Sequence, residues 1–166
     1  QQGYDAPLKL ILEKADATSV TFSVEALDEE TTWIGQIVGK EWFESFTTEE
    51  LLAEDLRYYN GMAGENDVTL EEYLSSILSR GSHQNIRMAG LDPQTDYVVY
   101  IYGLTPAGVV TTRLFHKEFS TEPPYEGNDV TYDIDVEVNR AIATITITPS
   151  HEGVAYFNNR ITREDF

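Results

Sequence analysis

The sequence contains no cysteine and little positive charge. Its 166 residues include 11 Lys and Arg against 29 Asp and Glu, which gives a net charge of −18. Without cysteine, disulfides, thiolate metal sites and cysteine nucleophiles are all excluded. The lack of a basic surface excludes nucleic acid as a partner, because binding to a polyanion depends on Lys and Arg that displace counterions. An anionic membrane surface is disfavoured for the same reason.

Long apolar runs are also missing. No run approaches the about 18 residues that cross a bilayer, and residues 1–10 lack the charged start and apolar stretch of a signal peptide. We therefore expect neither feature in this sequence. A hydrophobic fraction of 41% with 11% aromatic residues is nevertheless enough to build a packed core.

Apolar residues that alternate with a period of two predict strands before and after a central helical segment. In residues 19–25, for example, Val20, Phe22 and Val24 share one face. The other expected strands cover residues 8–13, 31–38, 83–88, 97–102 and 109–119, with a turn at 106–108. These elements predict a mainly β protein with antiparallel sheets.

The central segment changes to a helical period of 3.6. Apolar residues form one stripe at Leu70, Tyr73, Leu74, Ile77 and Leu78. Capping boxes at Thr47–Glu50 and Thr69–Glu72 predict helices at about 47–60 and 69–79, with residues 60–64 as the loop between them. Their apolar stripes are too wide to leave in water. We expect the pair to lie across the outer face of strand 97–102.

The pattern of the first strands is repeated near the end of the chain, after a stiff boundary at 121–124. Shifting residues 141–166 back by 123 positions places Ala143, Ile145 and Ile147 on Val20, Phe22 and Val24, and Tyr156 and Phe157 on Trp33 and Ile34. The predicted domains are residues 1–122, with a helical insertion at about 41–80, and residues 123–166, which hold the first three strands of a second copy. Three strands do not enclose a core. They must contact the first domain, pair with another copy of the chain, or belong to a longer chain.

One short motif resembles a known family. The segment Leu91-Asp92-Pro93-Gln94-Thr95-Asp96-Tyr97 is similar to the L-x-P-x-T-x-Y segment before the sixth strand of fibronectin type III domains. Leu91, Pro93, Thr95 and Tyr97 would form a tyrosine corner, in which the tyrosine hydroxyl bonds to nearby backbone. The resemblance implies an immunoglobulin- or fibronectin type III-like antiparallel sandwich with a helical hairpin packed on one sheet, plus a partial second sandwich.

The helical insertion resembles a subgroup of tandem fibronectin-like domains in surface lipoproteins of gut Bacteroidetes. This likeness implies a secreted module on the extracellular face of the outer membrane, lipid-anchored in the full-length precursor. Its implied role is adhesion or glycan handling. No lipid-bearing cysteine is present in these 166 residues.

The candidate catalytic and metal-binding residues are few. His83, His116 and His151 are far apart in sequence and belong to no catalytic motif. Residues 64–72 carry oxygen ligands but lack the first half of an EF-hand loop. We expect no catalytic residue, metal or cofactor, and we interpret the ten acids in residues 41–80 as a charged solvent face. Alternatively, this acidic surface steers a basic partner.

The aromatic residues are the main candidates for ligand binding. Flat aromatic rings stack on sugars, but they also fill cores. Packing is the favoured interpretation for Tyr100 and Tyr102, whereas Trp42 and Tyr58 fit either role.

The sequence therefore predicts a non-enzymatic extracellular module for adhesion, spacing or interaction, which contacts protein or glycan at the cell surface. Self-association through residues 125–166 is a further expectation, because unpaired strand edges recruit other strands. The alternative is a carbohydrate-binding module in glycan capture. A remote alternative is a catalytic or accessory domain of a glycoside hydrolase, which would need two acids facing each other across a groove.

Overall fold

The computed structural model describes residues 7–124, 131–139 and 142–150. The chain divides into two compact units, Gln1–Pro124 and Tyr125–Phe166. The structure is mainly β with antiparallel sheets and few helices. Each unit is described by itself below.

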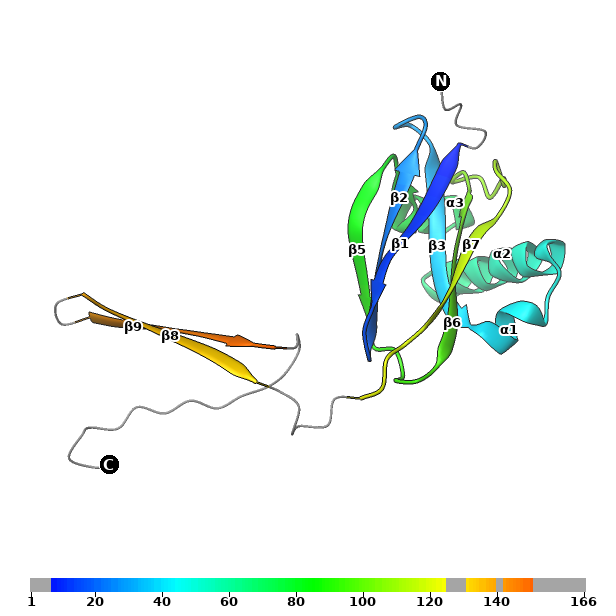
Figure 1. Ribbon diagram of the computed structural model, residues 1–166. Coiled ribbons are helices and arrows are strands. Elements are labelled where there is room, and N and C mark those ends of the chain that lie inside the picture. The colour runs from blue at the N-terminus through cyan, green and yellow to red at the C-terminus, as the bar shows by residue number, and fades with distance from the viewer. Residues whose placement is uncertain (1–6, 125–130, 140–141, 151–166) are drawn as a thin grey trace, which may run out of the picture. The chain divides into compact units, whose positions relative to one another are not determined.

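The first unit contains two antiparallel sheets and a helical layer (Figure 1). One sheet has the order β1-β2-β5 and the other has the order β4-β3-β6-β7. The strands are β1 (Leu8–Ala15), β2 (Ser19–Ala26), β3 (Thr32–Gly39), β4 (Ser79–Arg80), β5 (His83–Ala89), β6 (Asp96–Gly103) and β7 (Phe115–Ser120). The helices α1 (Lys40–Glu44), α2 (Thr48–Glu65) and α3 (Leu70–Ile77) come between β3 and β4.

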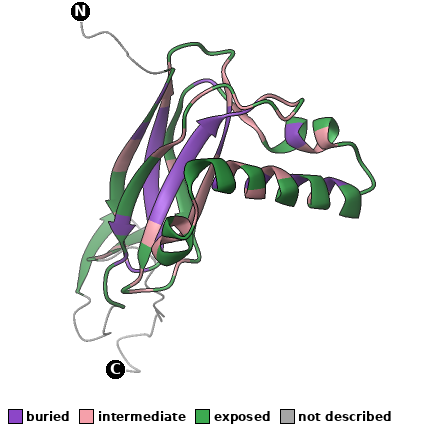
Figure 2. Cartoon of the chain, turned by 90° about the vertical axis from the view of Figure 1, so that its right-hand side faces the viewer, coloured by how far each residue is buried: buried purple, intermediate pink, exposed green. Residues whose placement is uncertain are grey.

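Two apolar clusters lie on opposite faces of the four-stranded sheet. The first is shared with the other sheet and includes Val20, Phe22, Val99 and Ile101. The second joins β3 and β6 to the helices. Its buried members are Ile34, Leu51, Tyr59, Leu74, Tyr100, Tyr102 and Leu104. The predicted docking of the helices on the outer face of the β6 strand is thus confirmed, and Figure 2 shows buried and exposed positions along α2.

Both predicted helices form, with their capping boxes at Thr47–Glu50 and Thr69–Glu72. The predicted loop at 60–64 is wrong, because α2 continues to Glu65. Burial of Ala63, on the same stripe as Tyr59, stabilises a segment that two glycines would weaken by about 1 kcal/mol each. A short helix, α1, was also not predicted.

Two further expectations need correction. Ile77 is 36% exposed, since it is the last residue of α3 and the chain becomes extended at Leu78. The last strand of the unit begins at Phe115, not at residue 109. Before it, the chain passes closely over Gly103, whose backbone bonds to the Thr111 amide (2.9 Å) and the Thr112 hydroxyl (2.8 Å). A Cβ at Gly103 would lie 2.3 Å from the Thr111 hydroxyl, so this crossing requires glycine.

The described part of the second unit is an antiparallel hairpin of β8 (Tyr132–Asn139) and β9 (Ile142–Pro149). These two strands fall where the sequence repeat predicts the first two strands of a second copy. The third predicted strand, with Tyr156 and Phe157, lies outside the described residues, as does His151.

Candidate functional site

A carboxylate is buried between helix α2 and the four-stranded sheet. Asp55 is 6% exposed and lies on the inward face of α2, between Leu51 and Tyr59. The hydroxyl of Tyr100 donates to both carboxylate oxygens at 3.0 Å, and the hydroxyl of Tyr102 donates to Oδ2 at 3.1 Å. This Asp55 cluster therefore ties α2 to the central strand β6.

Tyr59 and Gln36 extend the Asp55 cluster to β3. The Gln36 side-chain amide donates to the Tyr59 hydroxyl at 2.8 Å. Tyr59 also packs on Tyr73 of α3, with 6.4 Å between ring centroids. Every buried side-chain nitrogen and oxygen in the described residues has a hydrogen-bond partner. Because an unsatisfied polar group is costly in a low-dielectric interior, the complete network favours one docked position of the helices.

Burial is the largest influence on the pKa values of the side chains in the Asp55 cluster. It raises the pKa of the Asp55 carboxyl, although the hydrogen bonds from Tyr100 and Tyr102 act in the opposite direction. Burial and the nearby Asp55 charge raise the pKa of both these tyrosines. Burial also raises the pKa of Tyr59 to about 12. The tyrosines therefore stay protonated donors at neutral pH.

The buried position of Tyr100 and Tyr102 overturns their role as candidate ligand-binding residues. They are 1% and 0% exposed, so no sugar ring reaches them. Their planes are nearly parallel, at 7°, with 6.4 Å between centroids. Packing, the favoured sequence interpretation, is what the structure shows for both rings.

The other two candidate rings remain at the surface. Trp42 of α1 is 41% exposed and lies against Phe46, with ring centroids 4.8 Å apart. Tyr58 of α2 is 55% exposed and meets Tyr59 edge-on. The two rings therefore have different aromatic neighbours.

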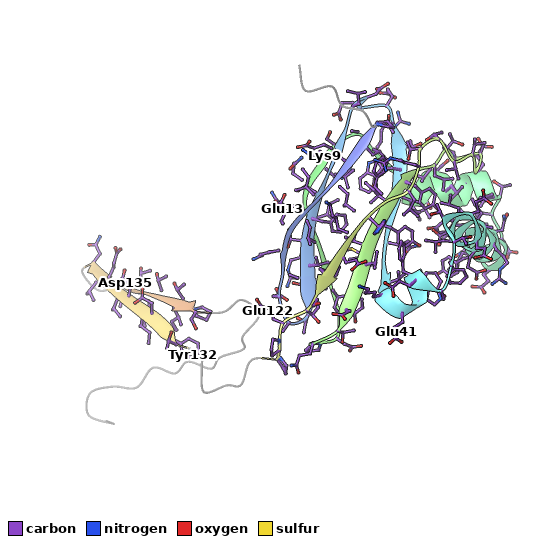
Figure 3. All side chains as sticks on the ribbon, turned by 45° about the vertical axis from the view of Figure 1, so that its right-hand side comes forward. Lys9, Glu13, Glu41, Glu122, Tyr132 and Asp135 are labelled. Carbon is purple, nitrogen blue, oxygen red and sulfur yellow. The ribbon has the colours of Figure 1, made fainter. Side chains whose placement is uncertain are left out.

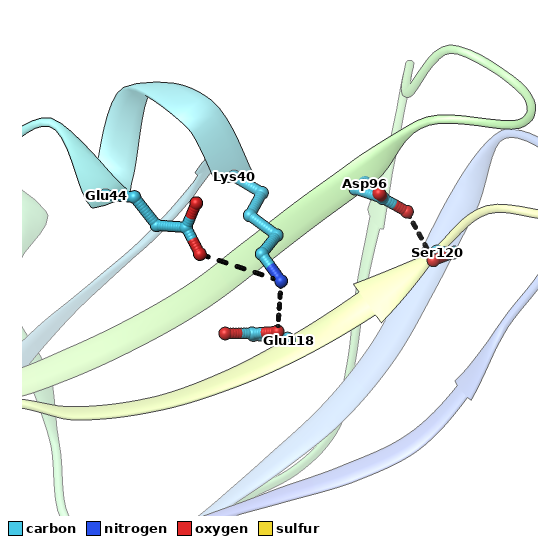
Figure 4. A network of polar contacts seen from close by, with 5 residues as sticks. All are labelled: Lys40, Glu44, Asp96, Glu118 and Ser120. Atoms are coloured by element: carbon cyan, nitrogen blue, oxygen red, sulfur yellow. Dashed lines mark hydrogen bonds and ion pairs between the residues drawn. The ribbon is translucent and has the colours of Figure 1, made fainter.

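Polar and aromatic contacts fix the helix that carries Trp42. Lys40 is the first residue of α1 and bridges Glu44 (3.6 Å) and Glu118 of β7 (2.7 Å), as Figure 4 shows. Phe43 packs on His116 and Tyr100 with centroid distances of 5.1 and 5.7 Å. Exposed ion pairs contribute little stability, so the Phe43 contacts hold α1 more strongly.

The predicted tyrosine corner has the expected geometry around Tyr97. Its hydroxyl accepts a hydrogen bond from the Asp92 amide at 3.0 Å. Thr95 donates through its hydroxyl to the Pro93 carbonyl at 2.9 Å, while Leu91 packs against the inner core. These contacts fix the turn that leads into β6.

The geometry offers few groups for catalysis. Among the described residues, no group of three or more His, Asp or Glu side chains is placed to hold a metal ion. His83 bonds to the Arg80 carbonyl, whereas His116 packs on Phe43. The carboxyl of Asp55 is enclosed by tyrosines, away from any substrate in solvent. The described helices include none that is long and apolar enough to cross a membrane.

Asp55 is the feature that the sequence interpretation missed, since it was counted with the acids of a solvent face. The available signal was its spacing of four residues from both Leu51 and Tyr59. Covered tyrosines at 100 and 102 also require hydrogen-bond partners.

Comparisons with protein-family models, with curated proteins and with solved structures gave no match.

Proposed function

We propose that the first unit is a fibronectin type III-like sandwich with a docked helical pair, acting as a non-enzymatic interaction module. The strand arrangement supports the fold assignment. Immunoglobulin-like sandwiches place the first, second and fifth strands in one sheet and the third, sixth and seventh in the other. Here β1, β2 and β5 form one sheet, while β3, β6 and β7 lie in the other. The Tyr97 hydroxyl bond at the start of β6 also fits the corner of that family.

The observation that carries the functional proposal is that the polar and aromatic groups on the helices fall into a buried set and an exposed set. The buried ones, in the Asp55 cluster, hold the fold together. The exposed ones are acids of first turns, such as Glu49 and Glu71, and the rings of Trp42 and Tyr58. Such a surface suits recognition of a protein or glycan better than chemistry, and its negative charge favours a basic protein partner through electrostatic steering.

The biological setting follows from the sequence resemblance. We place the module on the extracellular face of a bacterial outer membrane, with a lipid anchor in the full-length precursor. There it would space or present binding surfaces for adhesion.

A carbohydrate-binding module is the second candidate, and the exposure of Trp42 favours it. Its ring is held by Phe46 at one side and is 41% open to solvent. A pyranose could stack on such a ring, because the apolar face of the sugar matches the apolar body of an indole.

Binding of the purified chain to a glycan array and to a panel of basic cell-surface proteins tests both candidates. Trp42→Ala and Tyr58→Ala are the informative variants, and Leu27→Ala is the control because Leu27 is 63% exposed and follows β2 on the other sheet. We expect a ligand whose affinity falls at least tenfold in one ring variant and is unchanged in the control. Glycan binding would assign the carbohydrate module. Turnover of a glycan, or binding that neither ring variant weakens, would contradict the proposal.

A further inference from the structure

The pair Asn60 and Gly61 combines a reactive sequence with a helical position. An asparagine followed by glycine can modify itself, because glycine has no side chain to hinder the attack of its backbone nitrogen on the asparagine amide. Such a pair favours turns, and the sequence predicts a loop at 60–64. In the structure both residues are exposed and lie inside α2, near its end at Glu65.

The docked helix opposes this reaction. The Asn60 side-chain amide donates to the Leu56 carbonyl at 3.1 Å, one turn back along the helix from Gly61. In an α-helix the Gly61 nitrogen also takes part in the backbone hydrogen-bond ladder. Closing a ring between the two groups needs a non-helical backbone angle at Asn60. Modification therefore requires this part of α2 to open.

The end of α2 is weakly held. Gly61 and Gly64 each weaken the helix relative to alanine. Of the described residues 60–65, only Ala63 is buried. The last turn ends in Glu65 rather than in a basic residue, which opposes the helix dipole. Few contacts therefore have to break when this segment opens.

The cap that ends α2 is also unfavourable. The Asp67 amide donates to the Gly64 carbonyl at 3.2 Å, and the Val68 amide donates to the Ala63 carbonyl at 3.1 Å. These are the two bonds of a Schellman motif, in which glycine usually occupies the left-handed position. Here that position is taken by Asp67, with φ 54°. Segments with few buried contacts open locally while the rest of a domain stays folded, and we expect this of residues 60–65.

We propose that the pair Asn60 and Gly61 is a self-modification site that reacts when the end of α2 opens. The Gly61 nitrogen attacks Cγ of Asn60 and loses its proton, the bond from Cγ to Nδ2 breaks, and ammonia leaves. Water then opens the resulting five-membered imide at either carbonyl, which gives aspartate or isoaspartate. Water is thus the co-reactant, and the chain supplies both reacting groups.

Either product hinders the return of α2 to the sheet. Aspartate adds negative charge near the C-terminal end of the helix, where the dipole disfavours it. Isoaspartate adds one atom to the main chain, so the regular hydrogen-bonded rings of the helix do not form across it. The affected end carries Ala63 and Tyr59, whose hydroxyl accepts from Gln36 of β3. Modification therefore loosens the helical layer, which lies on the far side of the four-stranded sheet from β1, where Figure 3 labels Lys9 and Glu13.

The rate of modification in the full chain, compared with the rate in a synthetic peptide of residues 56–66, tests the proposal. Chromatography and mass spectrometry of a protease digest measure the loss of Asn60 and separate aspartate from isoaspartate. We expect the chain to react roughly ten to a hundred times more slowly than the peptide, since the helix opens only part of the time. Protection equal to or greater than the unfolding constant from urea denaturation would overturn the proposal, because modification would then need complete unfolding.

Variants separate local opening from global unfolding. A Cβ at Gly64 would lie in open space, so Gly64→Ala should strengthen the end of α2 and slow the modification about fivefold. Gly39→Ala is the matched control, because a Cβ is equally free there and Gly39 ends β3. Ile101→Val removes a buried methylene from the inner core and weakens the whole unit, yet it should leave the rate unchanged. A rate that rises in Ile101→Val, or that stays the same in Gly64→Ala, would overturn the proposal.

Discussion

The two faces of the β4-β3-β6-β7 sheet are built from different chemistry, although both come from alternating residues of the same strand. Val99 and Ile101 of β6 face the other sheet in an apolar core that also contains Phe22. Tyr100 and Tyr102 face the helices and bond to Asp55. Burial of apolar surface is non-directional, whereas a hydrogen bond requires a defined distance and angle. The inner face thus contributes burial, while the outer face also fixes the position of α2.

This difference explains how the helical insertion docks on the sheet in one defined position. The exposed faces of α2 and α3 are rich in acids, and α3 buries only Leu74 fully. Two hydroxyls that meet one carboxylate restrict the sliding that apolar contacts alone would permit. This docking places a titratable group in the interior. The stability of the outer face should therefore depend on pH much more than the stability of the inner face does.

The largest effect is expected from the inner face. Ile101→Ala should lower the free energy of unfolding by about 3 kcal/mol, since it removes buried methyl groups and leaves a cavity. Ile101 is 0% exposed and lies against Gly35 of β3. Urea denaturation followed by tryptophan fluorescence measures the change. A loss under about 1 kcal/mol would mean that the inner core collapses around the missing side chain.

On the outer face, Asp55→Ala should lower the free energy of unfolding by about 2 kcal/mol, because it leaves two buried hydroxyls without an acceptor. Glu54→Ala is the matched control. Glu54 is the adjacent acid on α2 and pairs with Arg57 on the solvent side, so its loss should cost far less than the loss of Asp55. Equal losses for the two variants in urea denaturation would show that Asp55 does not dock the helix.

The pH dependence separates the two faces further. Because burial raises the folded-state pKa of Asp55 above its ordinary value of 3.8, the folded state binds its proton more tightly than the unfolded state does. The stabilisation that Asp55 contributes is complete below its unfolded-state pKa. It is lost as the pH rises through the raised folded-state pKa.

Asp55→Asn removes this titration while preserving the shape of the side chain. Relative to the wild type, the variant should gain stability as the pH rises from the unfolded-state value of 3.8 through the raised folded-state pKa. Urea denaturation of both proteins between pH 3.5 and 7 measures the difference, in which titrations common to both cancel. Ile101→Ala should differ from the wild type by the same amount at every pH. A constant difference for Asp55→Asn as well would rule out the titration of Asp55.

Much of the architecture follows from local patterns in the sequence. Alternation at Val20, Phe22 and Val24 predicted a strand that faces the core, and it does. Thr47 and Thr69 predicted both helix starts correctly, because a capping box is a local interaction within four residues. The split of β6 into Val99 and Ile101 on one face and Tyr100 and Tyr102 on the other also followed from alternation.

Features decided by distant contacts were not predictable in this way. Asp55 appears in sequence as one acid among ten in its segment, and its burial depends on tyrosines 45 and 47 residues away. The continuation of α2 through Gly61 and Gly64 depends on the buried surface that Ala63 meets. The late start of β7 depends on the close passage of Thr111 over Gly103. In each case a tertiary contact outweighs the local preference.

The smallest expected effect separates the helical layer from the sandwich. Thr69→Ala removes the hydroxyl that accepts from the Glu72 amide at the start of α3, and should cost about 1 kcal/mol. Since α3 contacts only the outer face, hydrogen exchange should accelerate at the amides of Tyr73 and Leu74, while Val20 and Val24 in β2 keep their protection. If exchange accelerates equally in β2, the two faces unfold as one cooperative unit, and the polar docking of the helices is then as essential to the sandwich as its apolar core.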